Sequence, residues 1–263
     1  MSTDPEPESL LVERSPEGIV TATMNRPRRR NALNLDMMRR LRDLLDEVRA
    51  SQSDRVLILT GAGGAFCSGS DLDDRRSDSR PALERMRWIG DIALRLHRVG
   101  KPVIAKVDGV AVGGGLALAL GCDLVVASAD ARLATAWTDR GLSPDLGASW
   151  LLPRMVGLHR AKELVLLGGM LSAHEAERVG IVNRVVPREE LHEAVSDWAR
   201  RLAAGPPIAL SMAKALLIEG MTASMDQSLE AEARAMAVNT SAEDFLEALE
   251  AFRAKRPPRF RGC

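Results

Sequence analysis

Two glycine-rich segments contain the residues best suited to chemistry in this sequence. The first is 61–72, Gly-Ala-Gly-Gly-Ala-Phe-Cys-Ser-Gly-Ser-Asp-Leu, and the second is 108–115, Asp-Gly-Val-Ala-Val-Gly-Gly-Gly. Glycine lets the backbone approach a ligand closely, and a helix N-terminus presents N–H groups that have no partner. Such loops can stabilise negative charge with backbone donors, or they can simply allow tight packing of a strand-to-helix turn. The two segments alone favour neither interpretation.

Neither segment carries the glycine motif of another common enzyme class. A dinucleotide site needs GxGxxG after the first strand and an acidic residue beyond it, and this arrangement is missing. The Walker pattern GxxxxGK[ST] and the nucleophile elbow GxSxG are missing too. The three cysteines and four histidines have no metal-ligand spacing, so we expect no metal site.

Strands and helices alternate around these segments. The apolar patterns predict strands at 10–14, 19–24, 56–60, 102–107, 122–127 and 132–134, and helices at 35–48, 85–99 and 116–120. This alternation predicts an α/β fold with a parallel sheet and crossover connections. From Asp145 onward the pattern is almost all helix, with capping boxes at Ser172 and Ser224.

The bulk composition argues against several classes of function. The 263 residues carry 36 basic and 36 acidic side chains, and this balance does not suggest a nucleic-acid or membrane-surface binder. No apolar run is long enough to span a bilayer, and residues 1–9 lack the basic start of a secretory signal. An odd, sparse set of three cysteines is typical of reduced thiols, so we expect a cytoplasmic protein.

Five segments follow one another in an order and at spacings typical of one enzyme superfamily. They are 25–34 with Asn-Arg-Pro and Asn-Ala-Leu-Asn, 66–72, 108–115, 180–183 with Gly-Ile-Val-Asn, and 251–260. Together they resemble the enoyl-CoA hydratase/isomerase (crotonase) superfamily over essentially the whole chain. The resemblance implies a spiral of ββα units over 1–200 and a helical trimerisation region over 201–263. It also implies a homotrimer or a dimer of trimers.

The resemblance implies an oxyanion hole made by the backbone N–H groups of Ser70 and Gly114. Removing a proton beside a thioester leaves negative charge on the thioester oxygen, and one preorganised donor there is worth about 3–4 kcal/mol. The substrate would be an acyl-CoA that brings CoA with it, with no separate cofactor. Positions that match the CoA contacts of the family are Arg28, Arg30, Ala32, Ser68, Asp71, Leu72, Phe252 and Lys255, the last two sometimes across a subunit boundary.

The side chains must identify the reaction, because this scaffold hosts several. Hydratases hold a water between two glutamates, but the matching positions here are Ala117 and Trp137. Asp145 matches the catalytic aspartate of several enoyl-CoA isomerases, including the ring-rearranging isomerase of phenylacetate breakdown. One general base can move a proton along a dienolate and contributes roughly 10²–10⁴-fold. The predicted function is therefore an enoyl-CoA isomerase, although Asp145 after Ser-Pro also has the pattern of a helix N-cap.

Other functions remain open. Trp137 and Asp145 also occur together in 4-chlorobenzoyl-CoA dehalogenase, but the position of its histidine base is Gly90 here, so dehalogenation or hydrolysis ranks lower. Trp137 can also be only a wall of the acyl pocket. A hydratase-type lyase and a non-catalytic binder of acyl-CoA or RNA are further alternatives, although the neutral net charge argues against RNA.

Overall fold

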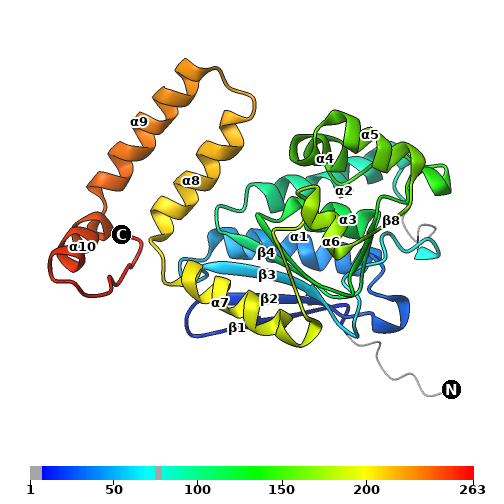
Figure 1. The fold of residues 1–263 in the computed structure, drawn as a ribbon, viewed down its shortest axis with the longest axis horizontal. Coiled ribbons are helices and arrows are strands. Elements are labelled where there is room, and N and C mark those ends of the chain that lie inside the picture. Colours follow the sequence, from blue (N-terminus) through cyan, green and yellow to red (C-terminus); the bar gives the residue numbers. More distant parts are fainter. Residues whose placement is uncertain (1–7, 75–78) are drawn as a thin grey trace.

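The computed structural model describes residues 8–74 and 79–263 (Figure 1). A six-stranded sheet has the spatial order β1-β2-β3-β4-β6-β9. Its strands are β1 (Leu10–Arg14), β2 (Ile19–Met24), β3 (Val56–Gly61), β4 (Val103–Val107), β6 (Leu124–Ser128) and β9 (Arg184–Val186). β1 and β2 form the predicted antiparallel hairpin, and the remaining pairings in this sheet are parallel. The two glycine-rich segments therefore leave the sheet at the same edge, from the carboxyl ends of β3 and β4.

A second sheet has three short strands in the order β5-β7-β8. They are β5 (Val110–Val112), β7 (Arg132–Ala134) and β8 (Met170–Ser172). The sequence patterns missed β5, β8 and β9, and the prediction of an almost entirely helical second half is wrong at β8 and β9. Each of these strands has only three residues, which are too few for the alternation that identifies a strand.

Helices cover both faces of the large sheet at its centre, so the strands β3, β4 and β6 are buried on both sides, whereas β1 is largely exposed. In β3, Leu57 and Leu59 belong to the apolar cluster on one face, and Ile58 belongs to the cluster that includes residues of α7. The helices of the core are α1 (Leu35–Ala50), α2 (Ala82–His97), α3 (Gly114–Gly121), α4 (Ala148–Val156), α5 (Leu158–Leu167), α6 (Ala173–Arg178) and α7 (Leu191–Ala203), with 3₁₀ turns η1 (Pro27–Arg29), η3 (Thr138–Arg140) and η4 (Arg188–Glu190).

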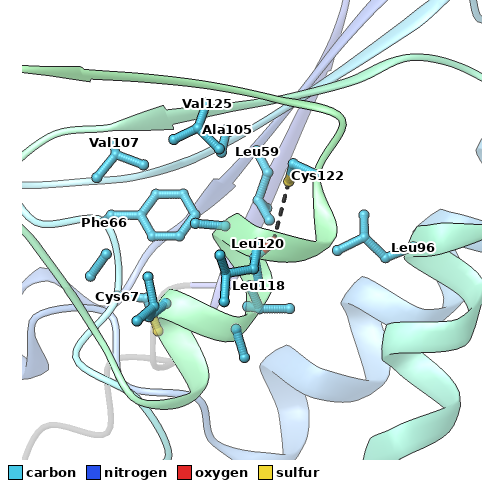
Figure 2. Packing of buried hydrophobic residues seen from close by; sticks show 14 of the residues in the cluster. Leu59, Phe66, Cys67, Leu96, Ala105, Val107, Leu118, Leu120, Cys122 and Val125 are labelled. Atoms are coloured by element: carbon cyan, nitrogen blue, oxygen red, sulfur yellow. Dashed lines mark hydrogen bonds between the residues drawn. The ribbon is translucent and has the colours of Figure 1, made fainter. Parts of the chain in front are cut away.

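The helix α3 is buried along its whole length. A helix that is apolar on every side has no face for water, and this explains its place inside the core. Figure 2 shows Leu118 and Leu120 of α3 packed among Phe66 and other apolar side chains. The packing fixes the start of α3, which is Gly114.

The last three helices form an arm that stands away from the sheet in Figure 1. They are α8 (Pro207–Gly220), α9 (Met225–Ser241) and α10 (Glu243–Arg253). Both predicted capping boxes are confirmed, since Ser172 caps α6 and Ser224 caps α9. Several apolar side chains of the arm are exposed, including Leu217, Met225 and Phe252. The predicted division after residue 200 falls inside α7.

No single helix within 8–74 and 79–263 is both long and apolar enough to cross a membrane. α7 and α8 reach that length and composition only as a pair, across a bend of 106°. Leu191, Val195 and Ala199 of α7 are buried in the apolar cluster that also contains Ile58.

Candidate active site

The two glycine-rich segments are pressed against each other. Cys67 pairs with Ala111 in an isolated parallel bridge, in which Cys67 N donates to Val110 O and Val112 N donates to Cys67 O, both at 2.9 Å. A Cβ atom placed on Gly115 would lie 2.2 Å from Cys67 O. Only glycine at position 115 permits this approach.

The backbone at Ser70 directs its N–H away from the strand-like segment at Leu33. Leu33 N donates to Gly69 O at 2.8 Å, and Asp71 N donates to Leu33 O at 2.9 Å. Gly69 O and the Ser70 N–H belong to one trans peptide unit, so they point in opposite directions. A Cβ atom on Gly69, whose φ is +98°, would lie 2.9 Å from Val112 O. The Ser70 N–H therefore faces the side of the second glycine-rich segment.

Gly114 is the first residue of α3, and the first N–H groups of a helix have no intrahelical partner. Gly113 before it has a φ of +54°, in the region that favours glycine. A Cβ atom on Gly114 would lie 3.7 Å from Ser70 Oγ and 3.4 Å from Leu33 Cδ1. The structure thus brings Ser70 and Gly114 together, while their role as oxyanion donors stays a prediction.

Trp137 and Asp145 are joined by a hydrogen bond beside these donors. Trp137 Nε1 donates to Asp145 Oδ1 at 3.0 Å. The indole is buried, and its Nε1 would lie 4.0 Å from a Cβ atom on Gly113. The N-cap of α4 is Gly147, two residues after Asp145. The bond to Trp137 places the carboxylate close to the second glycine-rich segment, and its catalytic role stays a prediction.

Two residues next to this pair have a strained backbone. Ala136 precedes Trp137 with a φ of +49°, and Leu146 follows Asp145 with a φ of +47°. Residues with a Cβ atom rarely adopt this conformation, which costs of order 1–3 kcal/mol and clusters at functional sites. Leu146 is buried, and its Cδ1 would lie 3.3 Å from a Cβ atom on Gly114. Neither strained position had a signal in the sequence.

Three other positions, Ala117, Gly90 and Cys67, supply no acid, base or nucleophile. Ala117 is buried inside α3, where a hydratase would carry its first glutamate. Gly90 has no side chain, so the position of the dehalogenase histidine carries no base. Burial raises the pKa of the Cys67 thiol to about 12, which keeps it neutral. In the described part of the chain no group of three His, Cys, Asp or Glu side chains could hold a metal ion.

Six of the predicted CoA-contact positions lie on two adjoining segments. Ser68 N donates to Arg30 O at 3.0 Å, and Ser68 Oγ donates to Arg29 O at 3.2 Å. Arg28 and Arg30 are exposed, and Ala32 is half-buried. Leu72 is 53% exposed and available for a ligand. The sixth position is Asp71, whose carboxylate contacts other residues of the protein.

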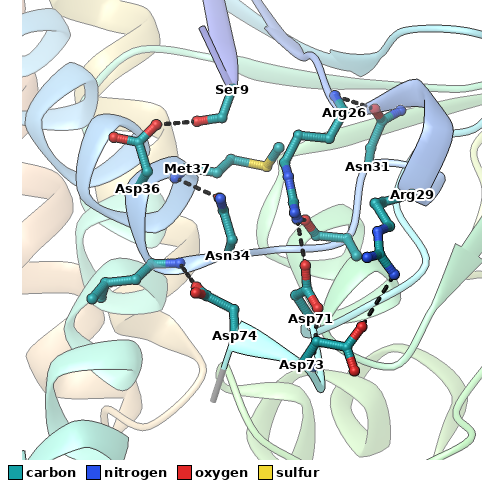
Figure 3. Close-up of polar contacts among 12 residues, drawn as sticks. Ser9, Arg26, Arg29, Asn31, Asn34, Asp36, Met37, Asp71, Asp73 and Asp74 are labelled. Atoms are coloured by element: carbon teal, nitrogen blue, oxygen red, sulfur yellow. Dashed lines mark hydrogen bonds and ion pairs between the residues drawn. The ribbon is translucent and has the colours of Figure 1, made fainter. Parts of the chain in front are cut away.

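The Asp71 carboxylate is engaged within the protein (Figure 3). It is buried and lies 2.7 Å from Arg26 Nη1. Burial alone would raise the pKa of Asp71, but Arg26 and the backbone N–H groups of Asp73 and Asp74 outweigh it and lower that pKa. Sequence reasoning did not identify Arg26 as a site residue, although the Asn-Arg-Pro motif contains it.

The remaining two predicted CoA-contact residues, Phe252 and Lys255, do not lie on these two segments. Phe252 is near the end of α10 and is 84% exposed, and Lys255 follows the helix. Figure 1 shows α10 with the arm, away from α3. One chain does not bring them to Ser70 and Gly114, and a contact with CoA across a subunit boundary stays a prediction.

Comparison with known proteins identifies the family. The enoyl-CoA hydratase/isomerase family model matches residues 14–263. The 1,2-epoxyphenylacetyl-CoA isomerase of Escherichia coli K12 is 39% identical over 251 residues, 94% of this chain and 96% of that protein. Human enoyl-CoA hydratase domain-containing protein 2 is 38% identical over 256 residues, 94% of this chain and 86% of that protein. The crystal structure of an enoyl-CoA hydratase from Bacillus anthracis superposes with a TM-score of 0.93 at 34% identity, covering 97% and 100% of the two chains.

This chain belongs to the enoyl-CoA hydratase/isomerase family. Its predicted α/β crotonase fold, with a helical C-terminal region, is confirmed, and so is its prediction as an enzyme of this family. The names of its relatives include both isomerase and hydratase, so membership alone leaves the reaction open.

Proposed function

We propose that this enzyme isomerises the double bond of an enoyl-CoA. The observation that supports this most directly is the hydrogen bond of 3.0 Å from Trp137 Nε1 to Asp145 Oδ1 beside Ser70 and Gly114. Asp145 is a carboxylate at a family position, while the glutamate positions of a hydratase hold Ala117 and Trp137. A single carboxylate is sufficient for proton transfer between two carbons.

In the proposed reaction Asp145 removes a proton from the carbon between the double bond and the thioester of a 3-enoyl-CoA. The electron pair moves onto the thioester oxygen and gives a dienolate, which Ser70 N–H and Gly114 N–H stabilise. Asp145 then returns the proton two carbons further along, and the product is the 2-enoyl-CoA. The indole of Trp137 orients the carboxylate and, being buried, helps to keep water from the site.

The similarity to the 1,2-epoxyphenylacetyl-CoA isomerase supports an isomerase and suggests acyl groups with an aromatic or cyclic part. The runner-up is a hydratase-type lyase, supported by relatives named hydratase. That reaction would need a second acid–base group, because Asp145 alone would have to activate the water and protonate the α carbon.

The test measures conversion of 3-enoyl-CoA to 2-enoyl-CoA in deuterated water, with mass spectrometry of the product. Asp145→Ala should lower kcat roughly 10²–10⁴-fold, because the general base is lost. Asp139→Ala is a matched control, since Asp139 is an exposed carboxylate six residues earlier in the sequence and should be silent. Equal turnover by wild type and Asp145→Ala would exclude Asp145 as the base. A product heavier by one water would favour the hydratase.

The proposal includes a cytoplasmic enzyme that acts on acyl-CoA without a further cofactor, as a homotrimer or a dimer of trimers. Free thiols at Cys67, Cys122 and Cys263 support a reducing compartment. The exposed apolar side chains of the arm support self-association, because large apolar patches are rarely left in water. Sedimentation equilibrium of the purified protein tests the assembly, and a monomer at micromolar concentration would contradict it.

A further inference from the structure

Arg26 connects to the Ser70 N–H through a line of hydrogen-bonded peptide groups. Its Nη1 donates to Ala32 O at 2.7 Å. That carbonyl shares a peptide unit with Leu33 N, which donates to Gly69 O at 2.8 Å. The Gly69 carbonyl in turn shares a peptide unit with Ser70 N. The guanidinium is therefore the first member of a chain that ends at the predicted oxyanion donor.

A cation at the start of such a chain strengthens the donor at its end. Peptide groups in series polarise one another, since each N–H becomes a better donor when the carbonyl of the same peptide unit accepts a hydrogen bond. The guanidinium also fixes the Ala32–Leu33 peptide, and through it the Gly69–Ser70 peptide. Position and polarity of the Ser70 N–H thus both depend on Arg26.

Arg26 is itself fixed by its surroundings (Figure 3). Its Nη1 lies 2.7 Å from Asp71 Oδ2, and the side chains are only 21% and 7% exposed. Its backbone N–H donates to Asn31 Oδ1 at 2.9 Å, and Asn31 is fully buried. A pair so far removed from water is screened little by salt, unlike an ion pair on the surface.

We propose that Arg26 is a positioning residue of the reaction, which aligns and polarises the Ser70 N–H through the peptides Ala32–Leu33 and Gly69–Ser70. It acts without touching the substrate. The inference rests on the proposed oxyanion role of Ser70, but it does not depend on which reaction follows enolate formation.

The test reads the polarisation of a bound thioester directly. Phenylacetyl-CoA labelled with ¹³C at the thioester carbonyl is bound to wild type, Arg26→Ala and Arg26→Lys, and the carbonyl stretch is measured by infrared difference spectroscopy. We expect the shift to lower frequency on binding to be smaller in both variants. In turnover, kcat should fall about tenfold to a hundredfold, less than for complete loss of a donor, with a smaller change in KM. Free guanidinium should restore part of the shift in Arg26→Ala.

Asp73→Asn is the matched control. It breaks the pair between Asp73 and Arg29 on the same two loops, whose side chains are 78% and 61% exposed, and it should leave the carbonyl shift at the wild-type value. If Arg26→Ala does not fold, Arg26→Lys carries the test, because it keeps the charge and most of the volume needed for folding but lacks the planar guanidinium that fixes the Ala32 carbonyl.

A wild-type shift in the Arg26 variants would overturn the proposal, and so would a wild-type protein that does not shift the carbonyl at all. A shift that depends on Arg26 in a protein that does not isomerise 3-enoyl-CoA would sustain this inference and reject the isomerase. A failure of the Arg26 inference and a failure of the isomerase proposal therefore give different results.

Discussion

The two glycine-rich segments present neighbouring donors but are held by different forces. Segment 61–72 buries Phe66 in the core, but around Ser70 it is held chiefly by polar contacts, the hydrogen bonds of Asn31 to its carbonyls and the Arg26–Asp71 ion pair. Segment 108–115 begins with the ion pair of Asp108 and Arg188, but its Gly114 end is held by packing, since it runs into the buried helix α3 and Leu146 covers Gly114. Substitutions on the Ser70 side of the site should therefore act by removing charges or hydrogen bonds, and substitutions on the Gly114 side should act by changing side-chain volume.

The largest effect is expected for a change of volume in the packed segment. Gly115→Ala would put a Cβ atom 2.2 Å from Cys67 O, so the two segments must separate and Gly114 must move. We expect kcat to fall by about 10²-fold or more and unfolding free energy to fall by about 1–3 kcal/mol. Turnover and denaturant titration measure the two effects.

Gly90→Ala is the matched control for this prediction, because Gly90 is also a helical glycine. A Cβ atom there would meet no described atom within 4 Å. Stability should be unchanged or higher by up to about 1 kcal/mol from the better helix propensity of alanine. Equal losses in the two variants would mean that packing at Gly115 has no special role.

Removal of a polar anchor from the first segment is expected to act on stability, without the large fall in kcat expected for Gly115→Ala. Asn31 donates through Nδ2 to Ala62 O and Ala65 O at 2.9 and 2.7 Å, and accepts from Arg26 N at 2.9 Å. Asn31→Ala leaves these buried groups without partners, so unfolding free energy should fall by about 2–4 kcal/mol in a denaturant titration. Asn25→Ala, which removes one exposed hydrogen bond, should cost about 1 kcal/mol or less. A loss in Asn31→Ala as small as that would remove the distinction between the two segments.

The smallest effect is the pH dependence of the ion pair. The pKa of Asp71 is lowered in the folded protein, so its stabilising contribution is present above the unfolded pKa of about 4 and is lost as pH falls through the folded value. The stability difference between wild type and Asp71→Asn should therefore shrink below about pH 4. Urea titrations of both proteins at a series of pH values measure it, and a difference that grows in acid would contradict the assignment.

Long and strongly patterned elements were predictable from the sequence. α1 has Asn34 at its N-cap, with the side chain accepting from Met37 N, and its buried residues recur at helical spacing. The hairpin β1–β2 and the buried strand β3 were predictable for the same reason. By contrast, β5, β8 and β9 are three-residue strands whose existence depends on their pairing partners, which a local pattern does not contain.

Some residues of the candidate site were likewise predictable from the sequence, and others were not. Ser70, Gly114 and Asp145 came from motifs, and the structure places all three in one region. Local sequence favoured Asp145 as the N-cap residue, whereas the structure begins α4 later, with Gly147 at the N-cap. Arg26 could not be identified, because its link to Ser70 passes through carbonyl and N–H groups that every residue possesses. The strain at Ala136 and Leu146 was equally hidden, since neither residue type favours a positive φ.

The burial of α3 has a consequence for the electric field at Gly114. A helix carries about half a positive elementary charge at its N-terminus, and here no residue of the helix reaches solvent that would screen it. An anion at Gly114 therefore meets an attractive potential that comes from the backbone of the fold and not from any side chain. Replacing the side chains at positions 117, 137 or 145 would change where protons go, and this potential would remain. Under the proposed role of Gly114 as an oxyanion donor, such a scaffold could exchange one enolate reaction for another while retaining its means of stabilising the common intermediate.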